Sequence, residues 1–199
     1  MKFLLIFCLT LTTALANPIR VQFNMAEGPV VIELYPDQAP IGVENFLRHL
    51  GPPSEERAQA LGLRTDLSAF DQGAFFRVVD ARTTRSYSIL HGGVWEAYDD
   101  CIFPFVALEN TNVTGLKNVE GVVGYVRFSN DPLSNGHEFF VNMKDNPLLD
   151  YGSPISFEGT SNFGRVVSGM DVLRRIQAWP LRGNFLQTQE PFREVRLLP

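Results

Sequence analysis

A carboxylate and a large aromatic ring share one face of a short predicted strand near residue 140. Residues 134–142 begin with the turn dipeptide Asn135-Gly136 and continue into Phe139-Phe140-Val141, a run that is typical of a β-strand. Period-two alternation places Glu138 and Phe140 on the same side of that strand. The pair indicates either an edge strand with one solvated face or the wall of a binding site, and this stretch alone leaves both open.

The elements that would position such a site begin with a hairpin and two helices. Alternating apolar and polar residues predict a strand over 20–25, and the apolar run 30–34 predicts its partner. Helical spacing of apolar residues predicts a helix from Pro40 to residue 50, which Gly51-Pro52-Pro53 ends. Ser54 and Gly62 then cap a short added helix on the surface.

Further short strands are predicted over 75–79, 119–127, 139–142 and 194–198, with a second amphipathic helix opening at Ser168 or Asp171. Strands of this length around two helices, with no regular strand–helix alternation, favour an antiparallel β-barrel or sandwich with capping helices. The sequence contains no zinc-binding pattern, P-loop or glycine-rich dinucleotide turn, so neither a metal nor a cofactor is expected.

The N-terminus has the composition of a cleavable secretory signal peptide. Lys2 precedes an apolar run over residues 3–15, and Ala14-Leu15-Ala16 has the small-x-small form of a cleavage site. A buried N-terminal strand is the alternative. We expect residues 1–16 to be removed, leaving a single domain over 17–199 that enters the secretory pathway. The last four residues are not an ER-retention signal, so export is favoured over retention in the ER lumen.

The mature chain is moderately acidic. Removing Lys2 leaves 16 basic and 22 acidic residues, a balance of −6, which argues against nucleic acid and against an anionic membrane as partners. Cys101 is the one cysteine left in the mature chain, so the domain has no internal disulfide. Asn112-Val113-Thr114 is a candidate N-glycosylation sequon.

A series of motifs in fixed order resembles the cyclophilin family over roughly residues 21–176. The resemblance implies a mainly β fold, a closed eight-stranded antiparallel barrel capped by two α-helices. It also implies peptidyl-prolyl cis/trans isomerase activity on proline-containing polypeptides by a domain that we expect to be a monomer. The motifs are residues 28–36, Ala39-Pro40, 43–46, Phe75-Phe76-Arg77-Val78, His91-Gly92-Gly93, Glu109-Asn110, 115–118, Gly121, Glu138-Phe139-Phe140-Val141, Leu149-Asp150, 163–167 and 169–172.

The resemblance assigns roles to individual residues. Arg77 matches the family's catalytic arginine, and Phe140 matches the aromatic floor of the proline pocket. An arginine suits this reaction because it stays charged at any relevant pH and can donate to the prolyl nitrogen as the amide twists. The remaining residues expected in substrate binding are Ile89, His91, Val126, Arg127, Glu138, Leu148 and Leu149.

Several positions depart from the family pattern. Phe76 stands where many members carry histidine, while His91 and Glu138 stand where the family has glutamines. A glutamate accepts hydrogen bonds but does not donate them, so Glu138 could pair with Arg77 and divert it. We therefore expect weak or selective activity, and a protonated His91 could favour mildly acidic pH. Leu148 stands where several members carry a tryptophan, so weak cyclosporin binding is expected.

Two other functions remain open at this point. The barrel could be a non-catalytic module that binds proline peptides in the same groove, or an assembly subunit that keeps the fold alone. Arg77 and Phe140 favour an enzyme or a binding module over an assembly subunit.

Overall fold

The computed structural model of this chain describes residues 18–83, 86–94, 102–127, 133–134 and 136–199. The predicted signal peptide (1–16), Cys101 and Asn135 lie outside the described residues. Four α-helices occur in the described part: α1 (Pro40–Arg48), α2 (Glu55–Leu61), α3 (Thr111–Thr114) and α4 (Met170–Gln177). Three single 3-10 turns accompany them: η1 (Phe70–Gln72), η2 (Ala81–Thr83) and η3 (Pro147–Leu149).

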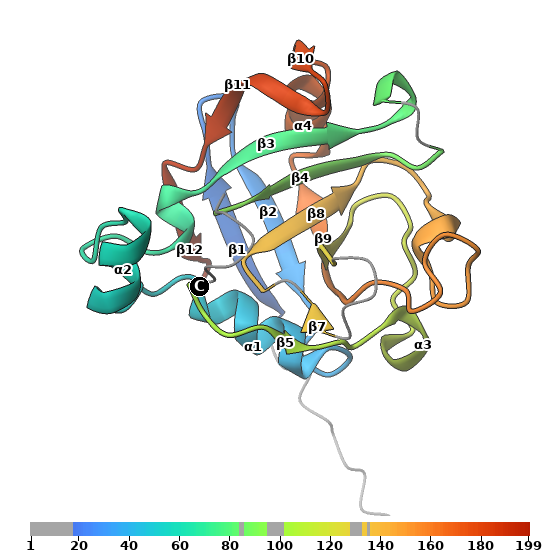
Figure 1. Cartoon of the computed structure of the whole chain (residues 1–199), viewed down its shortest axis with the longest axis horizontal. Helices are drawn as coiled ribbons and strands as arrows, with labels where there is room; N and C mark the ends of the chain where they lie inside the picture. The colour runs from blue at the N-terminus through green and yellow to red at the C-terminus, as the bar shows by residue number, and fades with distance from the viewer. Residues whose placement is uncertain (1–17, 84–85, 95–101, 128–132, 135) are drawn as a thin grey trace, which may run out of the picture.

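Antiparallel pairing joins ten strands into one sheet in the order β10-β11-β3-β4-β8-β6-β9-β2-β1-β12 (Figure 1). A separate two-stranded ribbon pairs β5 with β7. The strands are β1 (Ile19–Asn24), β2 (Val30–Leu34), β3 (Ala74–Val79), β4 (Ile89–Gly93), β5 (Val106–Ala107), β6 (Val122–Tyr125), β7 (Leu133–Ser134), β8 (Glu138–Asn142), β9 (Asn162–Ser168), β10 (Leu181–Arg182), β11 (Phe185–Pro191) and β12 (Glu194–Leu197).

The sheet curls until its two ends are joined by the chain itself. β11 pairs with β3, and β12 pairs with β1. β12 follows β11 directly along the chain. Between them, the Phe192 amide donates to the Gly73 carbonyl at 2.9 Å and the Arg193 amide donates to the Asn24 carbonyl at 2.9 Å. The mainly β, antiparallel prediction is confirmed. It differs in detail, because ten strands are present and no ladder between described strands closes the ring.

Local sequence accounts for several of these elements. Val21 and Phe23 point inward from β1 because strand residues alternate between the two faces. Pro40 lies in the first turn of α1, where it loses no hydrogen bond. The predicted caps of α2 are confirmed: the Ser54 hydroxyl accepts from the Arg57 amide, and Gly62 adopts a left-handed conformation. α4 begins after Gly169, between the two starts that the sequence suggested.

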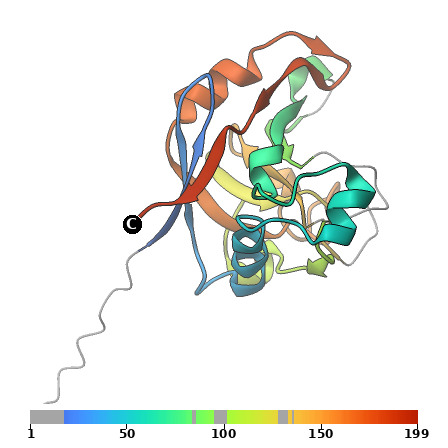
Figure 2. The same ribbon diagram turned by 90° about the vertical axis from the view of Figure 1, so that its left-hand side faces the viewer.

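The interior of the curled sheet is packed with aromatic rings. Phe23 lies within 6.2 Å, centroid to centroid, of four other buried rings, and tilted or edge-on contacts of this kind stabilise beyond the burial of area. α1 and α4 lie at opposite ends of the curled sheet and close the core from both sides (Figures 1 and 2). The four rings around Phe23 belong to Phe46, Phe70, Phe139 and Phe192.

Among the described helices, none is long and apolar enough to cross a membrane.

Candidate active site

A row of side chains crosses the outer face of the sheet, opposite the core. The register places Phe185 of β11 opposite Arg77 of β3, Arg77 opposite His91 of β4, and His91 opposite Phe140 of β8. Directly opposed residues on neighbouring strands project to the same face. Arg77 and Phe140 are therefore two strands apart, roughly 10 Å between Cα atoms at the usual strand spacing.

A β-bulge at Phe76 produces this arrangement. The register between β3 and β4 shifts between Phe75 and Arg77, so Phe76 is the extra residue on its strand. Phe75 packs into the core, whereas the Phe76 ring lies 4.8 Å from the His91 ring, centroid to centroid. The Phe76 ring thus covers His91.

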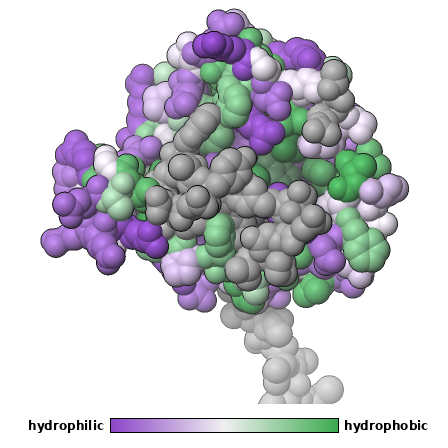
Figure 3. All heavy atoms as spheres, viewed as in Figure 1, coloured by the Kyte–Doolittle hydropathy of each residue, from purple (hydrophilic) through white to green (hydrophobic). Residues whose placement is uncertain are grey.

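An apolar cluster lies next to Arg77 on this outer face. Val79, Ile89 and Phe140 are buried together, separately from the core. In the view of Figure 3, hydrophobic side chains gather over η3 and the loop after it, beside a hollow over β4 and β8. Three of the predicted pocket residues, Ile89, Phe140 and Leu149, are brought together here, and Val126 packs against them.

Gly124 makes room for the Phe140 ring. A Cβ at this position would lie 3.1 Å from Cζ of Phe140 and only 2.2 Å from Oδ1 of Asn162. Asn162 has little room to move, because it is fully buried and its Nδ2 donates to the Leu116 carbonyl at 2.8 Å. The missing side chain on β6 therefore allows Phe140 to lie against the sheet as the floor of the cluster.

The guanidinium of Arg77 has an unusual environment for a half-buried cation. No carboxylate among the described residues forms an ion pair with it. Its Nε is buried and makes no hydrogen bond to a described residue. Cζ lies over the Phe185 ring, 5.9 Å from the centroid, at the distance of a cation–π contact. Buried donors are normally satisfied, so an unpaired Nε in a guanidinium without an ion pair is unusual.

Glu138 pairs with His91, and the pairing with Arg77 expected from the sequence is not seen. Oε2 of Glu138 lies 2.9 Å from Nε2 of His91, although the ring N–H is not aligned for a good hydrogen bond. Burial lowers the pKa of His91; Glu138 acts in the opposite direction, and Arg77 lowers it further. His91 is 2% exposed, so it lies beneath the pocket wall. The lowered pKa argues against the expectation that protonated His91 supplies a donor at mildly acidic pH.

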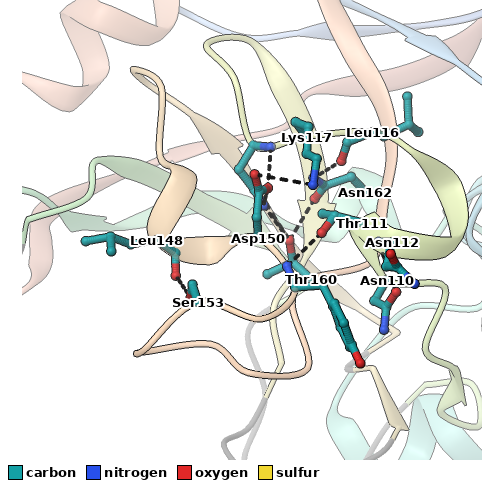
Figure 4. A network of polar contacts seen from close by, with 12 residues as sticks. Asn110, Thr111, Asn112, Leu116, Lys117, Leu148, Asp150, Ser153, Thr160 and Asn162 are labelled. Atoms are coloured by element: carbon teal, nitrogen blue, oxygen red, sulfur yellow. Dashed lines mark hydrogen bonds and ion pairs between the residues drawn. The ribbon is translucent and has the colours of Figure 1, made fainter.

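A polar network fixes the segment that carries Leu149 (Figure 4). Oδ1 of Asp150 accepts from both the backbone amide and the Nδ2 of Asn118, each at 2.9 Å. Asn118 Nδ2 also donates to Thr160, which ties the two sides of the loop together. The carbonyl of Leu148 accepts from the Ser153 hydroxyl. These bonds tie the residues on either side of Leu149 to the segment at Asn118 and to the following loop, so Leu149 is placed at the cluster by its neighbours.

Three predicted site residues stand apart from the apolar cluster. Leu148 is half-buried, and its side chain points away from the network in Figure 4. Arg127 is half-buried and follows Val126 at the end of β6. Asn112, the candidate glycosylation site, is exposed on α3, where Val113 is also strongly exposed.

Sequence reasoning did not identify three residues of the site. Val79 and Tyr87 lie two positions from Arg77 and Ile89, so period-two spacing could have placed them on the same face. Phe185 had no such signal, because the strand β11 itself was not predicted. Among the described residues, no group of three His, Cys, Asp or Glu side chains could hold a metal ion.

Comparison with known proteins identifies the family. The family model described as "Cyclophilin type peptidyl-prolyl cis-trans isomerase/CLD" matches residues 20–198. The chain belongs to this family. The resemblance of the sequence to cyclophilins and the predicted enzyme class, peptidyl-prolyl cis/trans isomerase, are both confirmed.

Several relatives of this cyclophilin are bacterial. It is 30% identical to the peptidyl-prolyl cis-trans isomerase cyp18 of Streptomyces antibioticus over 158 residues, 79% of this chain and 82% of the relative. It is 28% identical to a peptidyl-prolyl cis-trans isomerase of Acinetobacter baylyi over 93% of this chain and 85% of the relative. A crystal structure of a Cryptosporidium parvum cyclophilin, determined in the presence of the dipeptide Ala-Pro, has a TM-score of 0.63 and 17% identity, covering 90% of this chain and 99% of that one. It supports the fold.

Proposed function

We propose that this cyclophilin isomerises X-Pro bonds of polypeptides in the secretory pathway, with Arg77 as its catalytic residue. One observation carries the proposal: the Arg77 guanidinium has no ion-pair partner among the described residues and lies beside the separate apolar cluster of Phe140. A proline ring on Phe140 would bring its ring nitrogen toward a free, permanently charged donor.

The chemistry requires only these two features. Resonance in the peptide bond sets a barrier of about 18–20 kcal/mol to rotation. The twisted amide regains a lone pair on nitrogen, so a donor aimed at that nitrogen stabilises the transition state more than the ground state. Phe140, Ile89 and Leu149 supply the socket that holds the ring while Arg77 supplies the donor.

The proposed activity is weak or selective. The family's two glutamines provide neutral amide donors, and this chain has His91 and Glu138 instead. Glu138 can only accept, and burial lowers the pKa of His91, which opposes the protonated form that would donate from both ring nitrogens. Weak cyclosporin binding belongs to the same proposal, since Leu148 lies outside the apolar cluster. Tight binding in a direct titration would contradict this part.

A non-catalytic proline-peptide module remains the second candidate, because the same missing amide donors favour binding without turnover. Exchange rates of a series of X-Pro peptides with wild type and Arg77→Ala separate the two. Accelerated exchange that Arg77→Ala abolishes, with peptide affinity retained, is expected. Binding without acceleration by the wild type would leave the module as the function.

The secretory location is supported by the composition of residues 1–16 alone. Expression of the full chain in secreting cells, followed by N-terminal sequencing of the exported protein, tests it. The expected first residue is Asn17, and retention of the protein inside the cell with Met1 intact would contradict it. A mass shift removed by Asn112→Gln would show that the exposed sequon is used.

A further inference from the structure

A buried histidine lies between the Glu138 carboxylate and the proposed catalytic arginine on the outer face. Arg77 and Glu138 lie on strands β3 and β8, with His91 of β4 between them. Glu138 is two residues from Phe140, which is in register with Arg77 through His91. At ordinary strand dimensions the Cα atoms of Arg77 and Glu138 are roughly 12 Å apart. Two long side chains that lean toward each other span such a gap.

An ion pair between these two residues would therefore be expected, yet the carboxylate is found elsewhere. Oε2 of Glu138 lies 2.9 Å from Nε2 of His91, and the Glu138 side chain is only 13% exposed. Arg77 keeps a buried Nε without a hydrogen bond to a described residue. The Phe76 ring, 4.8 Å from the His91 ring, covers the imidazole from β3.

We propose that His91 is a positioning residue that holds Glu138 away from Arg77 and so keeps the guanidinium free for the prolyl nitrogen. This inference rests on the proposed function. It explains how a chain with a carboxylate in place of an amide donor can retain an unpaired arginine. The neutral ring is the form that suits this task, because burial and Arg77 both oppose its protonation. The charged groups around it are Arg77 and Glu138, with His137 acting through space.

The proposal predicts a suppression pattern among variants. His91→Leu removes the partner of Glu138, which then pairs with Arg77, so kcat/KM should fall roughly tenfold or more. Adding Glu138→Gln removes the competing charge and should restore most of the loss. His91→Gln should lose much less than His91→Leu, because its amide can donate to Glu138. Glu44→Gln on α1, where Glu44 is largely exposed, controls for loss of a carboxylate elsewhere.

A spectroscopic readout separates this inference from the proposed function. The ¹⁵Nε–H signal of Arg77 reports whether its guanidinium is paired. It should shift in His91→Leu and return in His91→Leu/Glu138→Gln, even if the wild type proves catalytically silent. A signal that is the same in wild type and His91→Leu, or a double variant as slow as His91→Leu, would overturn the positioning role. Thermal unfolding of each variant identifies a general loss of fold. If His91→Leu does not fold, His91→Phe takes its place, because it keeps a ring beside Phe76 and cannot donate to Glu138.

Discussion

The guanidinium of Arg77 lies over the ring of Phe185, with Cζ 5.9 Å from the ring centroid. The two residues oppose each other across β3 and β11, so the contact is built into the sheet register. No described carboxylate forms an ion pair with Arg77. The cation–π contact with Phe185 therefore orients the guanidinium without neutralising its charge.

Phe185→Leu should lower kcat/KM about two- to fivefold, because an exposed cation–π contact is worth about 0.5–1 kcal/mol. Phe185→Tyr keeps the ring and should retain the rate. Leu197→Ala on β12, which removes another exposed apolar side chain, is the matched control. Equal rates for Phe185→Leu and wild type would show that the ring does not position Arg77.

Gly124→Ala should destabilise the fold by about 1–3 kcal/mol, the usual cost of overpacking. The new methyl would approach the anchored Asn162 and the Phe140 ring. Chemical denaturation measures the loss of stability. Peptide affinity should also fall, because the new methyl group displaces the Phe140 ring. Gly62→Ala is a contrasting substitution: nothing lies within 4 Å of the added carbon there, although the left-handed backbone carries its own strain.

Asp150→Ala should weaken both stability and peptide binding. It leaves the backbone amide of Asn118 without its acceptor, which costs about 1–3 kcal/mol, and Nδ2 of Asn118 then keeps only its bond to Thr160. Asp150→Asn keeps an oxygen in place and should be much milder. The comparison of KM between these variants tests whether the network of Figure 4 positions Leu149. If both substitutions leave KM unchanged, η3 is held by other contacts.

Stability should fall as the pH drops below 6.5. Burial lowers the pKa of His49 to about 4, with His137 and Arg48 acting in the same direction. The ordinary pKa of histidine, which applies in the unfolded chain, is 6.5. Between pH 6.5 and pH 4 the unfolded chain therefore binds a proton that the folded chain does not, so the unfolded state is favoured. The loss from this one group between pH 7 and pH 5 is about 2 kcal/mol.

His49→Phe should flatten that pH dependence, because the substituted ring does not titrate. His49 stacks on Phe70 at 5.1 Å, so a phenyl ring suits the site. Unfolding free energies at pH 7 and pH 5 measure the difference. An identical slope in wild type and variant would mean that His49 is protonated in the folded protein. His91 and His137, whose pKa values are also lowered, contribute with the same sign in both proteins.

Those parts of the fold that carry a local signal could be predicted from the sequence. Alternation identified the β1–β2 hairpin, and caps at Ser54 and Gly62 fixed α2. β11 carries mostly exposed polar residues such as Gln187 and Gln189, so it has no hydrophobic period that would predict a strand. It forms because Phe75 and Arg77 of β3 offer a free edge to it.

The residues of the candidate site could be predicted from the sequence, but the contacts between them could not. The motifs identified Arg77, Ile89, Phe140 and Leu149. The partner of Glu138 depends on the strand register and on the bulge at Phe76, which brings that ring onto His91. Neither the register shift nor the burial of His91 can be calculated from residue types along one strand.

The central claim is that an unpaired Arg77 catalyses prolyl isomerisation. The most direct test is the exchange rate of one X-Pro peptide, measured by NMR at saturating peptide, with wild type, Arg77→Lys and Arg77→Ala. Lysine keeps the charge but lacks the planar guanidinium, so both variants should lose roughly a hundredfold in kcat while retaining the fold. An Arg77→Ala variant that exchanges the peptide as fast as wild type would contradict the account.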